Sequence, residues 1–441
     1  MRIMCALLAC TVLVLSGTSI GDPNGLESSQ AEITELPQSL TPNRVQALGA
    51  SAELPRSLTR IQVQALRASN DFGLNLLRRL YAERQDARAN VFVSPLSASM
   101  ELGMLMNGAG GETFNAMGTA LGLDGFMVAE ANEAYEDLVE LLVDLDPSVE
   151  FRVTNRSWLE EGIQIRRDYR NRLQETFGTG IESIRFDDPD VAGAINSWVG
   201  ETTEGRIAEM VTAGQFGGVD ALLVNTVYFK ADWTEPFDPA QTANVEFRRA
   251  DGSTMSVPLM GHVLDARVGG GEEYDEDFVV VDLPYGGEAY SMMVVVPVGE
   301  ATLAELVEGM DGERWQEVVE SLRGEARTEI RLPRFELSYE KILDDVLKAM
   351  GMEVAFDQSR ADFGWIFGNQ ALDIEPHIGG VKQKSFMRVD EVGTETAAAT
   401  GTGSSTSGNN VVQADRPFMF AIRERLYGTI LFVGTVTDPT S

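Results

Sequence analysis

The chain has 441 residues, of which 44% are hydrophobic and 8% aromatic, a composition typical of a globular protein and too apolar for wholesale disorder. Aspartate and glutamate number 68 against 35 lysine and arginine residues, which gives a formal net charge of −33. A polyanion of this size is repelled by nucleic acid and by anionic membrane surfaces, so the charge argues against both as partners. Adaptation to a salty habitat would explain the acidic composition equally well.

The first 19 residues are typical of a secretory signal peptide. A basic start at Arg2 is followed by the apolar run 3–15 and by small residues. The run is shorter than the roughly 20 residues that span a bilayer, so we expect a secreted protein, extracellular or periplasmic, with no membrane insertion. Both cysteines lie here, and Cys10 ends a stretch similar to a bacterial lipoprotein box. Because this stretch comes too early in the run, we favour free secretion over a lipid anchor.

Residues 20–53 are predicted to be a flexible linker, because they are rich in serine, glutamate, glutamine and proline with little periodicity. The sequence of residues 35–48 recurs in similar form at 53–66, where it leads into a helical pattern. The first copy is therefore interpreted as a partial duplication of the domain entry, and two copies are too few for a solenoid. We place the folded domain at residues 54–441.

Within the domain, helical and extended patterns alternate. Helical periodicity runs from Leu66 to Leu80, and residues 126–145 and 196–211 are also expected to be helical. Residues 221–229 form a continuous apolar run, typical of a strand covered on both faces. Hairpins are predicted for residues 278–283 with 289–296, and for 418–422 with 429–436. Because no strict βαβ alternation is seen, we expect an α+β domain with large antiparallel or mixed sheets.

An uncharged stretch of small residues precedes the last strands. After Glu395 there is no charge and no bulky side chain up to Asn410. Such a composition is common in flexible interdomain linkers. Here, however, only 441 − 410 = 31 residues follow, too few for a separate domain, and they include apolar strands that must return to the same core. The stretch therefore interrupts a domain.

The same stretch alternates with a period of two. Threonine, alanine and serine at the even positions from Thr394 to Thr406 share one face of an extended chain, and Glu395 falls on the other face. Threonine favours strand geometry, and small uncharged side chains can enter between neighbouring strands. This composition is typical of a loop that is exposed at one time and a central strand at another, with a plain mobile loop as the alternative.

Residues 391–400 resemble the reactive-loop hinge of inhibitory serpins. Other blocks resemble the same family, follow the family's order and together cover about residues 54–440: they are residues 90–97, 106–113, 195–207, 224–233, 347–363, 416–420 and 430–434. On these blocks the chain is identified as a member of the serpin superfamily, of bacterial type with an inhibitory hinge. The resemblance implies the serpin fold, an α+β fold of three β-sheets with eight or nine helices and an exposed reactive-centre loop.

The family resemblance also implies a protease inhibitor, not an enzyme. A serine endopeptidase, or a cysteine endopeptidase as the second class, attacks the loop and forms an acyl-enzyme. The loop then inserts into the main sheet as an extra strand and traps the protease. The expected partner is this covalently bound protease, the chain is expected to be monomeric, and no cofactor or metal is expected. The alternative is a non-inhibitory serpin that acts as a binding or storage protein.

The resemblance assigns roles along the loop. The hinge residues are Glu391, Gly393, Thr394, Glu395, Thr396, Ala397, Ala398, Ala399 and Thr400. Counting forward from Glu391 places the reactive bond at Ser407–Gly408, and counting back from Pro417 places it at Thr406–Ser407. Either bond presents a small side chain, which suits an elastase-like or subtilisin-like pocket and not a trypsin-like one.

The resemblance further implies a region where the main sheet opens. Ser94, Ser97 and Asn225 match positions beneath the parting strands, and Trp233 matches the end where insertion begins. Gln383 stands where many members have a histidine, so it can hydrogen-bond but a pH response there would be lost. Structural alternatives exist, since a Ser-Pro-Leu-Ser stretch is a good helix cap and a single tryptophan is usually core.

Overall fold

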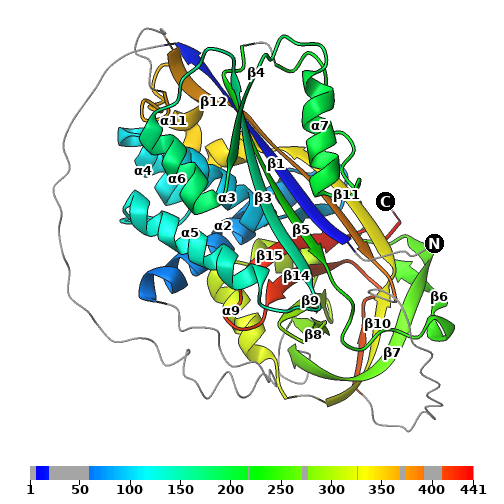
Figure 1. Ribbon diagram of the computed structural model, residues 1–441. Helices are drawn as coiled ribbons and strands as arrows, with labels where there is room; N and C mark the ends of the chain where they lie inside the picture. The colour runs from blue at the N-terminus through cyan, green and yellow to red at the C-terminus, as the bar shows by residue number, and fades with distance from the viewer. Residues whose placement is uncertain are drawn as a thin grey trace.

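A computed structural model describes residues 6–18, 59–216, 218–270, 277–324, 326–367, 374–391 and 410–440. One group of strands is a six-stranded sheet (Figure 1). In spatial order its members are β11 (Phe335–Ile342), β12 (Ile374–Val389), β1 (Ala6–Thr18), β5 (Ala221–Lys230), β3 (Glu150–Glu160) and β4 (Gly180–Ile184).

The second group of strands contains two sheets that share one long strand. Its order is β13 (Asn410–Gln413), β10 (Ala326–Pro333), β7 (Thr254–Gly270), β8 (Phe278–Tyr285), β9 (Tyr290–Pro297), β14 (Phe418–Glu424), β15 (Ile430–Val436) and β2 (Val91–Val93), with β6 (Ala243–Arg248) also paired to β7. Strand β7 pairs with β6 and β10 along its first part and with β8 only at its end. The described strands therefore form three sheets.

Eight α-helices and one kinked helical run accompany the sheets in the described residues. The helices are α2 (Arg60–Glu83), α3 (Pro95–Met106), α4 (Gly111–Ala120), α5 (Val128–Val143), α6 (Arg167–Phe177), α7 (Val191–Thr202), α8 (Leu303–Glu308) and α9 (Gly312–Ser321). The run comprises α10 (Asp344–Leu347), η4 (Lys348–Met352) and α11 (Glu353–Phe356), and a short turn η2 (Pro239–Gln241) precedes β6. The expected fold of three sheets and eight or nine helices is confirmed.

Most predicted elements lie where the sequence pattern placed them. Both hairpins and the apolar strand β5 are confirmed, and the pattern at 126–145 corresponds to α5. The prediction for 196–211 was wrong at both ends, because α7 begins at Val191 and ends at Thr202. Left-handed backbone at Glu204 (φ 48°) and Gly205 (φ 74°) stops the helix, a conformation that no helix can continue through.

The two faces of the six-stranded sheet are covered by different helices. Helix α7 lies on one face, where Ile195 and Val199 join the apolar cluster that contains Leu222 and Val224 of β5. Helix α3 packs against β5 and β1 within the larger core. Strand β5 is therefore covered on both sides, which explains its continuous apolar sequence. None of the helices in the described residues combines the length and apolarity needed to cross a bilayer.

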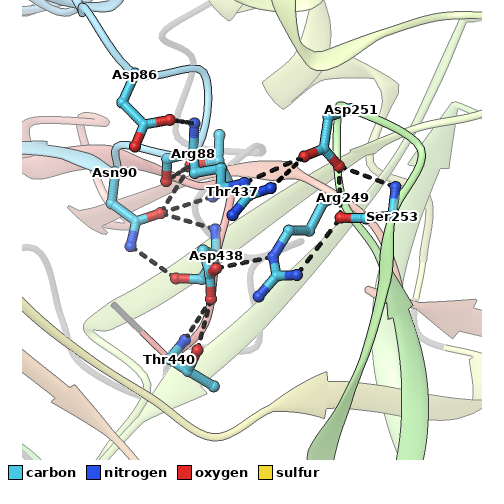
Figure 2. Close-up of polar contacts among 9 residues, drawn as sticks. All are labelled: Asp86, Arg88, Asn90, Arg249, Asp251, Ser253, Thr437, Asp438 and Thr440. Carbon is cyan, nitrogen blue, oxygen red and sulfur yellow. Dashed lines mark hydrogen bonds and ion pairs between the residues drawn. The ribbon is translucent and has the colours of Figure 1, made fainter.

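The C-terminal strands belong to the same core as the rest of the domain. All residues of β14 and β15 are buried. After β15, Asn90 holds the chain end: its Oδ1 accepts the backbone N–H groups of Thr437 (2.7 Å) and Asp438 (3.1 Å). Arg249 donates to the Asp438 carboxylate at 2.8 Å (Figure 2). The segment that precedes β13 thus interrupts one domain, as expected from the sequence.

Strand β1 is formed by the apolar N-terminal run that is predicted to be a signal peptide. It lies between β5 and β12 and is antiparallel to both (Figure 1). Its Leu13 and Leu15 are fully buried. A continuous apolar run is typical both of a secretory signal and of a strand covered on both faces, so the same residues satisfy both. Cleavage after residue 19 stays a prediction, and so does the linker at residues 20–53, which lies outside the described residues.

Candidate functional site: a strand slot in the main sheet

The candidate site is the position between β5 and β12, which we call the slot. In the described part of the chain, both strands pair with β1 and not with each other. The slot holds a strand of 13 residues, from Ala6 to Thr18. At about 3.3 Å per residue, this is a length of roughly 43 Å. The sheet can therefore accept one complete additional strand, and in this structure the strand comes from the far N-terminus.

Gln383 of β12 connects the sheet to the start of α3. Its Oε1 accepts the backbone N–H of Ser94, and its Nε2 donates to the carbonyl of the same residue, both at 3.1 Å. The Ser94 hydroxyl caps α3 by accepting the N–H of Ser97 (3.2 Å), and it donates to the carbonyl of Leu431 (2.8 Å). All these polar groups are buried, so each needs the partner it has.

A second buried chain of hydrogen bonds starts from Ser97. Its hydroxyl donates to Oδ1 of Asn225 in β5, and Asn225 Nδ2 donates to Oδ1 of Asn155 in β3 at 2.7 Å. Asn155 then donates to the carbonyl of Phe177 at 2.7 Å. We call these bonds, with the Gln383–Ser94 pair, the sheet-centre network. Thr11 of β1 pairs in register with both Asn225 and Gln383, so the network lies at the middle of the slot.

Trp233 lies just beyond β5, at the end of the slot where β12 finishes. Its indole N–H donates to the carbonyl of Asp390 (3.0 Å), the residue that follows β12. The ring stacks on Tyr285 with centroids 4.4 Å apart and an interplanar angle of 11°. The side chain is buried, as the alternative of a core tryptophan predicts. It also connects the end of β12 to the strand beside the slot.

Glu391 anchors the backbone where the loop leaves the sheet. Its carboxylate accepts hydrogen bonds from Arg334 and Thr242, and its carbonyl accepts the N–H of Phe237 (2.9 Å). Burial alone would raise the pKa of Glu391, but the hydrogen bonds from Arg334 and Thr242 outweigh burial and hold the pKa below its usual range. The carboxylate is therefore charged at neutral pH and fixes the start of the loop.

The loop runs from the main sheet to the edge of another sheet. It leaves after Glu391, and the chain is described again from Asn410, where β13 pairs in parallel with β10. The other hinge residues, from Gly393 to Thr400, and the reactive-bond residues Thr406, Ser407 and Gly408 lie outside the described residues. Their roles stay predictions.

The structure brings together the residues predicted at the sheet opening. Ser94, Ser97, Asn225 and Gln383 share the sheet-centre network, whereas Trp233 lies with Glu391 at the end of the slot. Their role in opening the sheet stays a prediction.

Sequence reasoning missed Asn155, Arg334 and Thr242. Asn155 carried a signal, since an asparagine inside a strand pattern needs partners when buried. Arg334 and Thr242 carried none, because they are distant from Glu391 in sequence. Among the described residues, no group of three or more His, Cys, Asp or Glu side chains is arranged to hold a metal ion.

Comparisons with known proteins give the family of this fold. The family model described as serpin (serine protease inhibitor) matches residues 67–439. Neuroserpin from Homo sapiens is 29% identical over 381 residues, which are 84% of this chain and 90% of neuroserpin. Serpin B8 from Bos taurus is 30% identical over 375 residues, 83% of this chain and 97% of that protein.

Solved structures agree in fold. A thyroxine-binding globulin complex with thyroxine has a TM-score of 0.74 at 25% identity, covering 85% of this chain and 99% of that one. The thermophilic serpin tengpin in its native state has a TM-score of 0.74 at 23% identity, covering 87% of this chain and 95% of that one. Strand β1 lies outside the residues that the family model matches, whereas β5, β12 and α3 lie inside them. The chain belongs to the serpin family.

Proposed function

We propose that this serpin inhibits serine endopeptidases of the elastase-like or subtilisin-like kind, with cysteine endopeptidases as a second target class, by inserting its cleaved loop into the slot. The observation that carries the proposal is the slot itself. Two strands of the serpin domain, β5 and β12, accept a complete antiparallel strand between them, and that strand comes from outside the part matched by the family model.

The position of the loop supports this proposal. The loop begins at Glu391, directly after β12, so a chain that turns back there runs antiparallel to β12, the direction that β1 takes in the slot. The even positions from Thr394 to Thr406 span 13 residues, the same length as β1. Their small uncharged side chains can be buried without an unpaired charge.

The proposed reaction has two stages. The protease nucleophile attacks the carbonyl of Thr406 or Ser407, the peptide C–N bond breaks, and the new amino group leaves on the C-terminal piece. That piece stays in the body of the inhibitor because β14 and β15 are buried in the core. The acylated end is free to follow residues 392–406 into the slot, which carries the protease away from the loop's original position before water can hydrolyse the ester.

The decisive experiment incubates the chain that starts at residue 20, in which β1 is absent, with elastase-like and subtilisin-like proteases. We expect a covalent complex that survives SDS and a clear rise in Tm when the loop is cut. We also expect a C-terminal peptide that begins at Ser407 or Gly408 and separates from the body only on denaturation. A cut that leaves Tm unchanged, with an attacker that departs fully active, would contradict loop insertion and would favour the non-inhibitory alternative of a binding or storage protein.

A matched pair of variants separates insertion from simple cleavage. Thr400→Arg places a charge on the face expected to turn inward, and Ala399→Arg places the same charge on the opposite face. We expect T400R to be cleaved as a substrate with little complex, because a buried unpaired charge slows insertion. A399R should form complex almost as the natural chain does. Equal loss in both variants would contradict the assigned faces.

A further inference from the structure

The start of α6 carries a cluster of arginines for which the proposed function has no use so far. Arg166, Arg167, Arg170 and Arg172 lie within seven residues, in a chain where acidic residues outnumber basic ones by 68 to 35. In the part of the chain that the structure describes, none of the four forms an ion pair. Like charges at this spacing repel one another, so the cluster is unfavourable in the isolated chain and favours a negatively charged partner.

Three of these arginines are available at the surface. Arg167 is exposed, and Arg166 and Arg170 are partly exposed. Arg172 differs from them, because its guanidinium group donates to the backbone carbonyl of Asn107 at 3.1 Å and so stabilises the fold. Asp168, the acidic residue within the cluster, is exposed and forms no ion pair with the four arginines. The three cationic groups can therefore contact another molecule.

An exposed tryptophan extends this surface. The guanidinium carbon of Arg166 lies 4.6 Å from the ring centroid of Trp365, which is 41% exposed. The backbone fixes this contact, since the N–H of Arg166 donates to the carbonyl of Ile366 at 2.8 Å. Tryptophan and arginine are among the residue types that contribute most to binding at protein interfaces. We call Arg166, Arg167, Arg170 and Trp365 the arginine surface.

The arginine surface lies near the end of the slot that is farther from the loop. Strand β1 ends at Thr18, which pairs with Ile374, the first residue of β12. Seven residues before Ile374, Phe367 forms an isolated bridge with Ile165, the residue directly before Arg166. Seven residues span at most about 25 Å, which limits the distance between Ile374 and this bridge. Figure 1 shows α4, α6 and α11 grouped near the start of β12.

We propose that the arginine surface is the contact face for the trapped protease after loop insertion, and that it selects proteases with an acidic surface. This inference rests on the proposed function, because the protease arrives there only when the loop fills the slot. An inserted strand of 13 residues, the length of β1, places the acylated residue at the end of the slot beside Ile374. A protease of roughly 250 residues is about 45 Å across, so a protease attached at that point can cover a surface within 25 Å.

Local charges decide this contact although the whole chain is acidic. The net charge of −33 repels an acidic protease during the first encounter. At physiological ionic strength the repulsion is screened beyond about 8 Å, so groups in direct contact dominate once the acyl bond holds the protease. The planar guanidinium group of arginine pairs with a carboxylate through two parallel hydrogen bonds. The arginine surface therefore holds an acidic protease and gives no such contact to a basic one.

The test measures how long the covalent complex lasts. The chain that starts at residue 20 is incubated with two subtilisin-like proteases, one acidic and one basic, at about 0.05 M sodium chloride. The half-life of the SDS-stable complex is compared for the natural chain and two triple variants. The first variant is R166Q/R167Q/R170Q. The control removes the same charge from exposed arginines on α2, β6 and β10 that likewise form no ion pair among the described residues, and it is R60Q/R248Q/R327Q.

For the acidic protease, we expect the half-life to fall about three- to tenfold in R166Q/R167Q/R170Q, as the loss of a few exposed ion pairs would cause, and to be unchanged in the control. At about 1 M sodium chloride the Debye length is about 3 Å, so this difference should disappear. With the basic protease, the natural chain and the variant should decay alike. If R166Q/R167Q/R170Q does not fold, R167Q/R170Q leaves the contact between Arg166 and Trp365 intact and serves instead.

The outcomes separate this inference from the proposed function. If complex forms with the acidic protease and decays equally in the natural chain and R166Q/R167Q/R170Q, the arginine surface has no role in trapping and loop insertion stands. An equal loss in the control would assign the effect to net charge and overturn the inference. Equal half-lives, with retention of only the natural chain on a sulfated polysaccharide, would mean that the surface binds a free polyanion. No complex with any protease would contradict the proposed function and the inference that rests on it.

Discussion

Glu391 is the last described residue before the loop, and its buried carboxylate forms an ion pair with Arg334. Its side chain is 4% exposed, whereas that of Arg334 is 44% exposed. The pair therefore joins a buried carboxylate to a side chain that water still reaches, which limits its net stabilisation. The carboxylate itself would be costly to bury without a donor.

Replacing Arg334 with alanine tests this anchor. We expect R334A to lower the free energy of unfolding at pH 7 by roughly 1–2 kcal/mol, because a buried carboxylate loses a donor. The folded state lowers the pKa of Glu391, so the stabilisation is present above about pH 4.3 and is lost as the pH falls through the lower folded value. Urea unfolding at several pH values should show the variant and the natural chain converging in acid.

Arg331→Ala is the matched control for this measurement. Arg331 lies on the same chain segment and pairs with Glu329, but both side chains are well exposed, at 43% and 31%. Such pairs contribute about 0–1 kcal/mol. If R331A proved as destabilising as R334A, the special role assigned to the Glu391 contact would be wrong.

The sheet-centre network makes a second prediction at this scale. Asn225→Leu removes the acceptor of Ser97 and the donor to Asn155, and leaves both of these buried groups without that partner. We expect a loss of roughly 2–4 kcal/mol in the free energy of unfolding, since each unsatisfied buried group costs about 1–3 kcal/mol. Asn244→Leu, at an exposed position on β6, should change it by less than about 0.5 kcal/mol. Chemical denaturation of the two variants checks the difference.

At the scale of elements, β1 decides whether the slot is free. A chain that keeps residues 1–19 has the slot filled by a strand with two antiparallel ladders. A loop can enter only after these hydrogen bonds break. We therefore expect the full-length chain to be cleaved as a substrate and the chain that starts at residue 20 to form the SDS-stable complex. Equal complex formation by both chains would show that β1 leaves the slot readily.

A substitution within β1 tests whether the strand itself, and not merely the extra length of the full-length chain, prevents complex formation. Leu13 is fully buried in the slot, so Leu13→Asp places a charge where the strand is covered. In the full-length chain this variant should weaken the occupation of the slot and recover complex formation. A peptide with the sequence of residues 6–18, added to the shorter chain, should suppress it again.

At the scale of the whole molecule, the net charge of −33 opposes compaction through self-repulsion. Salt screens this repulsion, since the Debye length shortens from about 30 Å at 0.01 M to about 3 Å at 1 M. We expect Tm to rise by several degrees between these salt concentrations. Differential scanning calorimetry measures the shift, and sodium chloride serves better than sulfate because sulfate also strengthens apolar burial. A Tm that falls with salt would mean that surface ion pairs outweigh the repulsion.

How far the sequence predicts the fold depends on how local the signal is. Apolar runs and turn residues locate β5, the two hairpins and α5, because each pattern reflects burial of one element. The end of α7 was not predicted, because apolar residues recur with helical spacing beyond it. The left-handed backbone at Glu204 and Gly205, which ends the helix, leaves that spacing unchanged. Ion pairs such as Arg334–Glu391 also escape, since no local pattern links residues so far apart.

The sequence by itself determined the family, the α+β class and the uncharged alternation of the loop, because these properties depend only on motif order and on the local spacing of residue types. Only the tertiary structure decided which strand lies between β5 and β12. The pattern of an apolar segment predicts that it is buried but does not predict which strands it pairs with. Competition among segments for one buried position is settled by the packing of the whole sheet.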